Sequence, residues 1–301
     1  MEDKPVTETK NRKWLTLLLK IAVTAVCLWY ISGKIDFSKA WASIKTANWS
    51  YLFLALIAFI VSKLISAIRL NVYFKNIRLH LSAWQNMKLY WLGMFYNLFL
   101  PGSISGDAYK VILLKKRYNS SYKKTTAAVL LDRFSGLLGL GLILGVYSIL
   151  VIDQIFYAVA IAGGSLLAVV IFYYIIARWF KEFVPGFFLT LLLGILVQTT
   201  QVICAYLIMA SLGIPAHVTE YIFIFLLSSI AAVLPLTIGG GLGIREVVFI
   251  EGAKLFGLTR DTSFVIGSFF YLITLATSAV GLIYVFHDPL SKKKKDPLLD
   301  P

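Results

Sequence analysis

The chain has 301 residues, of which 59% are hydrophobic and only 15% are charged. Soluble domains are about half apolar and about a quarter charged, so this composition excludes an ordinary soluble protein. The net charge of +14 is expected to face the anionic lipids of the inner leaflet and not nucleic acid. The 2 cysteines and 3 histidines show no metal-ligand spacing, so neither a metal nor another cofactor is expected.

Apolar segments long enough to cross a membrane as helices, which takes about 20 residues, recur along the chain. They are residues 14–31, 49–70, 126–152, 155–177, 187–212 and 262–286. A polar segment, 1–13, precedes them, and a basic tail, 288–301, follows them. A signal peptide is the alternative for residues 14–31, but no small-residue cleavage site precedes Lys34, which favours a span.

A further apolar segment, residues 89–114, is broken at its centre by Leu100-Pro101-Gly102-Ser103-Ile104-Ser105-Gly106-Asp107. Proline removes a backbone donor and glycine permits backbone shapes that a helix forbids, so a continuous helix is not expected. Each half is too short to span, and six basic residues from Lys110 to Lys124 follow the break. A re-entrant hairpin that starts and ends on the cytoplasmic side satisfies both the length and the positive-inside rule.

A second break, Leu234-Pro235-Leu236-Thr237-Ile238-Gly239-Gly240-Gly241, aligns with the first without gaps as Leu-Pro-x-(Ser/Thr)-Ile-x-Gly. We expect it to enter from the outer side, to turn between Pro235 and Gly243, and to return along residues 244–251. Paired interruptions of hydrophobic segments by glycine and proline indicate the binding site of a transporter.

The distribution of charge predicts the topology. With this set of spans, 20 of the 29 Lys and Arg residues fall on the inner side, as the positive-inside rule requires. Three full spans separate the hairpins, so the hairpins enter from opposite faces. The sequence therefore predicts an all-α integral membrane protein of about six full transmembrane helices plus two re-entrant hairpins. Residues 49–152 and 187–286 form an inverted repeat, and both termini are cytoplasmic in the cell (inner) membrane.

The returning half of each hairpin begins near Asp107 or Ile244. Helix N-termini attract anions, and a phosphate is the natural guest. Arg133 and Arg245 are the predicted phosphate clamps, because a guanidinium offers a bidentate fork. The alternative is structural: the breaks are packing kinks, Asp132 or Asp107 pairs with Arg133, and Glu246 pairs with Arg245.

Three other polar groups lie within apolar segments. Lys63 and Arg69 are expected to reach the inner head groups with their long side chains. Gln198 and Gln201 either line the cavity or join helices by hydrogen bonds.

The motifs resemble those of the transmembrane domain of lysylphosphatidylglycerol synthases and of its stand-alone flippase-like relatives. The resemblance covers about residues 14–287. Its functional positions, which we take as the candidate site, are Arg69, Pro101, Gly102, Gly106, Asp107, Lys110, Asp132, Arg133, Pro235, Gly239, Gly240, Gly243, Arg245 and Glu246. Three positions depart from the family pattern: Ser105 replaces a glycine, Lys110 an arginine and Asp132 a glutamate.

The resemblance implies a lipid flippase that moves a phospholipid or a lipid-linked glycan between leaflets. The soluble domain that performs aminoacyl transfer in the synthases has no counterpart in this sequence, so lysyl transfer is not carried over. Relatives also occur with glycolipid and polysaccharide pathways, which makes envelope glycolipid or lipid-modifying enzymes candidate partners.

Two rival functions stay open at this point. An integral membrane transferase could act on a lipid-phosphate donor, with Asp107 or Glu246 as general base. The chain could also be a structural partner of another envelope enzyme.

Overall fold

The computed structural model describes residues 37–99, 104–233 and 241–290, together with five helical positions between Leu18 and Trp29. Within these residues every regular element is a helix. The predicted segment 1–13, the basic tail beyond residue 290 and all but five positions of the predicted first span lie outside the described residues.

Five helices of the described part are long and apolar enough to cross a membrane. They coincide with five of the six spans expected from the sequence. They are α3 (Trp49–Asn76), α6 (Tyr122–Val151), α7 (Ile155–Trp179), α8 (Phe187–Ser211) with the preceding 3-10 turn η1 (Lys181–Gly186), and α11 (Arg260–Ala279) with its continuations η2 (Val280–Leu282) and α12 (Ile283–Phe286).

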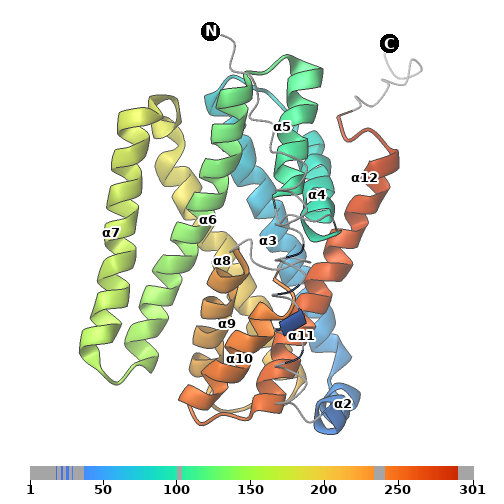
Figure 1. Cartoon of the computed structure of the whole chain (residues 1–301), viewed down its shortest axis with the longest axis vertical. Helices are drawn as coiled ribbons and strands as arrows, with labels where there is room; N and C mark the ends of the chain where they lie inside the picture. The colour runs from blue at the N-terminus through green and yellow to red at the C-terminus, as the bar shows by residue number, and fades with distance from the viewer. Residues whose placement is uncertain are drawn as a thin grey trace, which may run out of the picture.

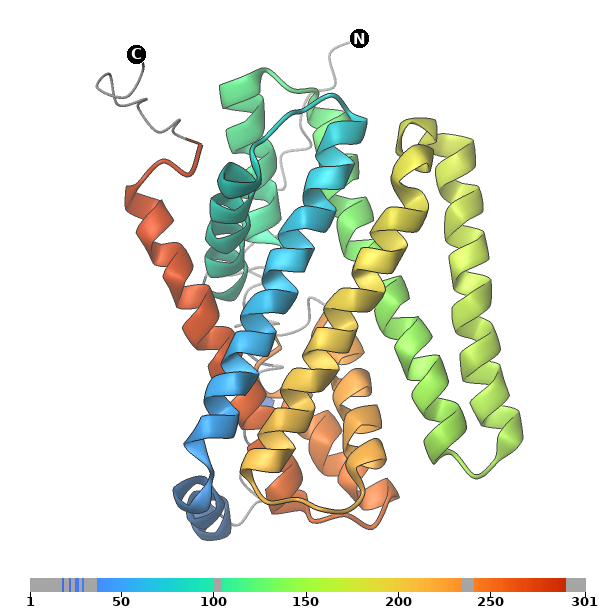
Figure 2. The same ribbon diagram turned by 180° about the vertical axis from the view of Figure 1, so that it is seen from behind.

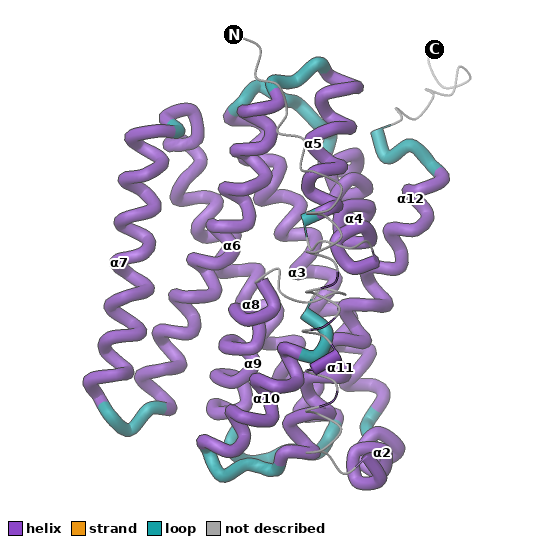
Figure 3. Tube along the Cα trace, in the orientation of Figure 1, coloured by secondary structure: helices purple, strands orange, loops and turns teal. Residues whose placement is uncertain are grey.

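The long helices α3, α6 and α8 run along most of the molecule, and α3 and α8 lie side by side on the face seen in Figure 2. Most connecting loops gather at the two ends of the molecule (Figure 3). Helix α7 stands to one side, packed along α6 (Figure 1). The short amphipathic helix α2 (Phe37–Thr46) lies across the lower end in this view, with Lys45 Nζ 5.7 Å from the centroid of the Trp41 ring.

The two broken segments form two pairs of shorter helices. Helices α4 (Ala83–Phe99) and α5 (Ser105–Tyr118) occupy one half of the molecule, and α9 (Val218–Val233) and α10 (Ile244–Leu255) occupy the other half (Figures 1 and 2). Helix α4 begins six residues before the predicted start at Leu89, and α5 continues past residue 114 to Tyr118. The tips at residues 100–103 and 234–240 lie outside the described residues.

The buried apolar side chains form two separate clusters. The first cluster includes Phe59 as its last member on α3 and Leu140 as its first member on α6. The second cluster begins at Leu70 on α3 and ends at Leu131 on α6. The intervals between them contain Lys63 and Arg69 on α3 and Asp132 and Arg133 on α6. The fold therefore leaves a polar layer at mid-height between two apolar halves.

Close packing of α6 against α8 depends on a pair of glycines. A Cβ atom at Gly139 would lie 2.5 Å from the carbonyl carbon of Gly194, a backbone atom that cannot move without shifting the helix. Replacement of either glycine by a larger residue would therefore push the two helices apart.

We expect Gly139→Leu to lower the midpoint of thermal unfolding in detergent by about 2–12 °C, because overpacking costs about 1–3 kcal/mol and a chain of this size loses about 2–4 °C per kcal/mol. Gly163→Leu is the matched control, since a Cβ added at Gly163 on α7 would meet no atom within 4 Å. Equal midpoints for the two variants would contradict the close contact.

Candidate functional site

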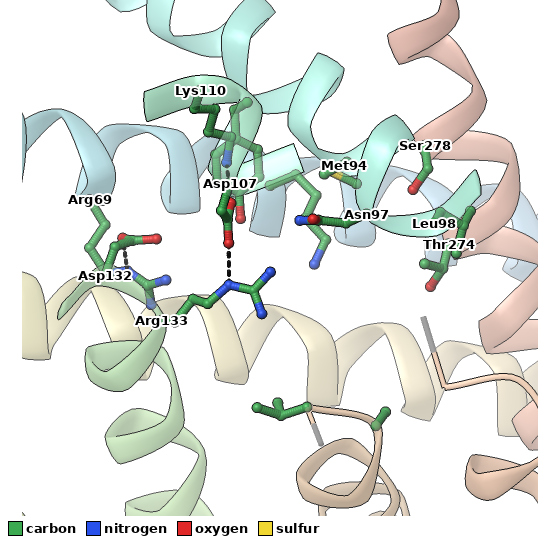
Figure 4. A pocket seen from close by; sticks show the side chains of 14 residues that line it. Arg69, Met94, Asn97, Leu98, Asp107, Lys110, Asp132, Arg133, Thr274 and Ser278 are labelled. Carbon is green, nitrogen blue, oxygen red and sulfur yellow. Dashed lines mark hydrogen bonds and ion pairs between the residues drawn. The ribbon is translucent and has the colours of Figure 1, made fainter. Parts of the chain in front are cut away.

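A cavity of about 310 Å³ opens where α3, α4, α5, α6, α9 and α11 meet (Figure 4). This volume is at the lower end of the range of about 300–1,000 Å³ that is usual for ligand pockets. Its charged lining residues are Lys63, Arg69, Asp107, Lys110, Asp132 and Arg133. Thr274 and Ser278 of α11 stand on the opposite wall, and Ala232 and Val233 at the end of α9 complete it.

Asp107 is the central acidic group of this cavity. One carboxylate oxygen, Oδ1, accepts a hydrogen bond of 3.0 Å from Lys110 Nζ, one turn further along α5. The other oxygen, Oδ2, pairs with Nε of Arg133 on α6. Figure 4 shows Asp107 between these two cations. Asp107 also lies in the first turn of α5, where the helix dipole favours a negative charge.

The hairpin fixes Asp107 through contacts between its two helices. Asn97 Oδ1 accepts a 2.9 Å hydrogen bond from the Gly106 amide, and Ser105 Oγ donates a 2.7 Å bond to the Tyr96 carbonyl. A Cβ at Gly106 would collide with the backbone of Gly93 on α4. The glycine preceding Asp107 in the motif therefore brings the first turn of α5 against α4.

Arg69 and Asp132 form a second, fully buried pair. Arg69 Nε donates a 2.8 Å hydrogen bond to Asp132 Oδ1, and their side chains are 5% and 9% exposed. Gly136 makes room for the guanidinium, since a Cβ there would lie 3.0 Å from both of its terminal nitrogens. The terminal nitrogen Nη1 has no hydrogen-bond partner among the described residues. The expectation that Arg69 reaches the inner head groups is therefore wrong: the buried carboxylate holds it at the cavity.

The second hairpin uses its acidic residue differently. Gly241 and Gly243 have φ angles of 101° and 85°, which glycine adopts readily. Glu246 Oε2 accepts a 2.9 Å hydrogen bond from the Gly243 amide and so caps α10. Arg245 is buried against the ring of Phe270, 4.8 Å from its centroid, with Nη1 3.5 Å from Ser229 Oγ. The structural alternative of a close Arg245–Glu246 ion pair is not what the structure shows.

The cavity unites five of the predicted site residues: Arg69, Asp107, Lys110, Asp132 and Arg133. Gly106 supports them from behind, whereas Gly243, Arg245 and Glu246 are not among the lining residues. The remaining predicted positions, Pro101, Gly102, Pro235, Gly239 and Gly240, lie outside the described residues.

The sequence interpretation missed Lys63, Tyr90 and Asn97 as lining residues. Lys63 lies in the middle of α3, and an ionisable residue at the centre of a span is itself a signal of a functional position. Tyr90 contacts Lys110, because the Nζ atom of Lys110 lies 4.7 Å from the centroid of the Tyr90 ring. Gln198 joins helices, donating a 3.2 Å hydrogen bond from Nε2 to the Gly136 carbonyl.

Comparison with known proteins identifies the family of the chain. The family described as lysylphosphatidylglycerol synthase TM region matches residues 17–188, which contain the whole first hairpin and all six charged lining residues. The chain is also similar to a UPF0104 membrane protein of Pyrococcus horikoshii, at 28% identity over 124 residues, which make up 40% of this chain and 36% of that protein. The chain thus aligns with little more than a third of that relative.

The family match extends over more than half of the chain and includes every charged residue that lines the cavity. The chain is thus a multi-pass membrane protein that belongs to the family of the lysylphosphatidylglycerol synthase TM region.

Proposed function

We propose that the protein transports lipids with anionic head groups between the leaflets of the cell membrane. The observation that carries this proposal is a cavity at mid-height of a multi-pass membrane protein that is lined by four cations and two carboxylates. Charge is expensive within a membrane and usually marks a substrate path. Family membership points to lipid as the substrate class.

The head group enters the cavity and its phosphate contacts Arg133. Arg133 is bound to Asp107 through Nε, and its side chain is 32% exposed, whereas the side chain of Lys110 is 5% exposed. A phosphate can therefore reach the guanidinium and compete with the carboxylate for it, while Lys110 continues to neutralise Asp107. The acyl chains stay in the surrounding bilayer during this exchange.

The helix pairs α4–α5 and α9–α10 act as re-entrant hairpins from opposite faces, within repeats 49–152 and 187–286. Their lengths support this layout, since α9 has 16 residues and α10 has 12, fewer than the roughly 20 that a span needs. In such inverted repeats, alternating access arises when one repeat rocks against the other around a central site.

Transport accounts for the carboxylates better than group transfer does. A general base must take a proton from its substrate. Asp107 is bound to two cations, and Glu246 is bound to the backbone amide of Gly243. Both candidate bases therefore already make the ion pairs or the hydrogen bond that stabilise the two helix pairs.

The orientation can be tested by labelling single cysteines with an impermeant maleimide, after Cys27→Ala and Cys204→Ala. We expect Asp153→Cys, in the α6–α7 turn, to react in intact cells and Lys116→Cys, near the end of α5, to react only after permeabilisation. These two positions flank α6, so reaction from the same side would contradict its assignment as a span. The reversed pattern would contradict cytoplasmic termini.

The site can be tested by leaflet exchange of fluorescent phosphatidylglycerol in proteoliposomes. Arg133→Gln should slow exchange about 10- to 100-fold, because hydrogen bonds to charged groups contribute about 1.5–3 kcal/mol. Arg133→Lys keeps the positive charge but loses the bidentate geometry of the guanidinium, so its exchange rate should lie between those of Arg133→Gln and the wild type. Lys116→Gln is the matched control, since Lys116 is exposed on α5 outside the cavity. Wild-type exchange by well-folded Arg133→Gln would contradict the site.

A further inference from the structure

Two cations near the polar layer contact aromatic rings and not carboxylates. Lys63 Nζ lies 4.4 Å from the centroid of the Phe59 ring, and Arg245 Cζ lies 4.8 Å from that of Phe270. Neither has a carboxylate within ion-pair distance among the described residues. Arg245 is only 8% exposed, so water does not compensate its charge.

The two rings belong to one aromatic pair. Phe59 and Phe270 meet edge to face, with centroids 5.5 Å apart and an interplanar angle of 83°. Lys63 and Arg245 therefore flank a single aromatic contact between α3 and α11. A cation–π contact contributes only about 0.5–2 kcal/mol, much less than a buried charge requires.

A count of the charged side chains in the polar layer shows how much positive charge has no matching carboxylate. Its cations outnumber its carboxylates by two among the described residues. The cations are Lys63, Arg69, Lys110, Arg133 and Arg245, and the carboxylates are Asp107, Asp132 and Glu246. Each carboxylate already has a partner. Asp107 pairs with Lys110 and Arg133, Asp132 pairs with Arg69, and Glu246 accepts a hydrogen bond from the Gly243 amide. No carboxylate of the described residues remains to compensate this excess.

We propose that the transported lipid carries a diphosphate esterified at both ends, to the lipid and to the rest of the head group, so that it supplies two negative charges, one on each phosphate. One phosphate binds Arg133 in the cavity, and the second binds Lys63 with Arg245 next to it. This inference rests on the proposed function and narrows its substrate class. A zwitterionic phospholipid would leave the excess unchanged, because its amine adds a cation for every phosphate. A singly charged lipid would compensate only half of it.

Lys63 has the position that this role requires. It lines the cavity together with Arg133, and its ring contact with Phe59 connects it to the buried Arg245 through Phe270. Lys63 thus serves as the specificity-determining residue that distinguishes two phosphates from one. Its removal should reduce discrimination between lipids more than it reduces transport of a singly charged lipid.

The test compares four labelled lipids on wild-type protein: a sugar-linked polyprenyl diphosphate, which is a diester with two negative charges, a sugar-linked polyprenyl monophosphate with one, phosphatidylglycerol with one, and zwitterionic phosphatidylcholine. Binding is read as thermal stabilisation in detergent, and exchange is read in proteoliposomes. We expect the diphosphate to bind at least about tenfold more tightly than the other three, which is about 1.4 kcal/mol. Equal binding of the monophosphate, or of phosphatidylcholine, would overturn the inference. Inorganic diphosphate is the soluble comparison, and equal binding without a lipid chain would assign the site to a soluble anion and overturn it as well.

Lys63→Met tests the residue, since methionine keeps much of the length of the side chain and removes its charge. The preference for diphosphate over phosphatidylglycerol should disappear in this variant. Lys88→Met is the matched control, because Lys88 also lies over a ring, 5.6 Å from the centroid of Trp84, but does not line the cavity. A preserved preference in folded Lys63→Met would contradict the role of Lys63, and the wild-type comparison decides the substrate class even if the variant does not fold.

The two proposals fail in different ways. Exchange of every lipid at the same rate would leave transport in place and reject the diphosphate. Tight binding of the diphosphate lipid without exchange of any lipid would reject transport and retain the substrate class.

Discussion

Asp107 is the group on which the arrangement of the polar layer depends. In a low-dielectric interior a charge must be paired or hydrogen-bonded, and this carboxylate meets two cations at once, one on its own helix and one on α6. It thereby ties the returning half of the first hairpin to a long membrane-spanning helix. The position of α5 follows from this electrostatic requirement together with the close contact of Gly106 on Gly93. Apolar packing alone would let such a short helix slide.

The fold was largely predictable because the bilayer imposes simple rules of length and charge. Apolar length located the five long helices, and proline with glycine located both breaks. Helix ends were less predictable: α3 continues to Asn76 and α5 to Tyr118, because polar turns beyond the hydrocarbon region can stay helical. Hydropathy reports the apolar core of a helix and not its hydrogen-bonded ends.

The ion pairs were harder to predict, and the reason is geometric. Asp132 and Arg133 are adjacent in sequence, which suggested pairing, but neighbours on a helix point in different directions. Asp132 instead binds Arg69, and Arg133 binds Asp107. The same rule separates Arg245 from Glu246, whose carboxylate turns back to the Gly243 amide. The Asp107–Arg133 pair, 26 residues apart, was one of the two alternatives named from the sequence and is confirmed, whereas the Arg69–Asp132 pair, 63 residues apart, was not anticipated.

The two hairpins begin from matching motifs but neutralise charge by different means. The first places an aspartate directly after its glycine and compensates its cations internally. The second has an arginine and a glutamate in the first turn of α10, uses the glutamate as a helix cap, and leaves the arginine against an aromatic ring. A strictly symmetric pair would bind an anion equally from both sides. In the proposed transport, this asymmetry sets an ion pair that a phosphate can exchange on one side and a cation without a carboxylate partner among the described residues on the other, so the electrostatic field favours a negative head group and opposes a positive one.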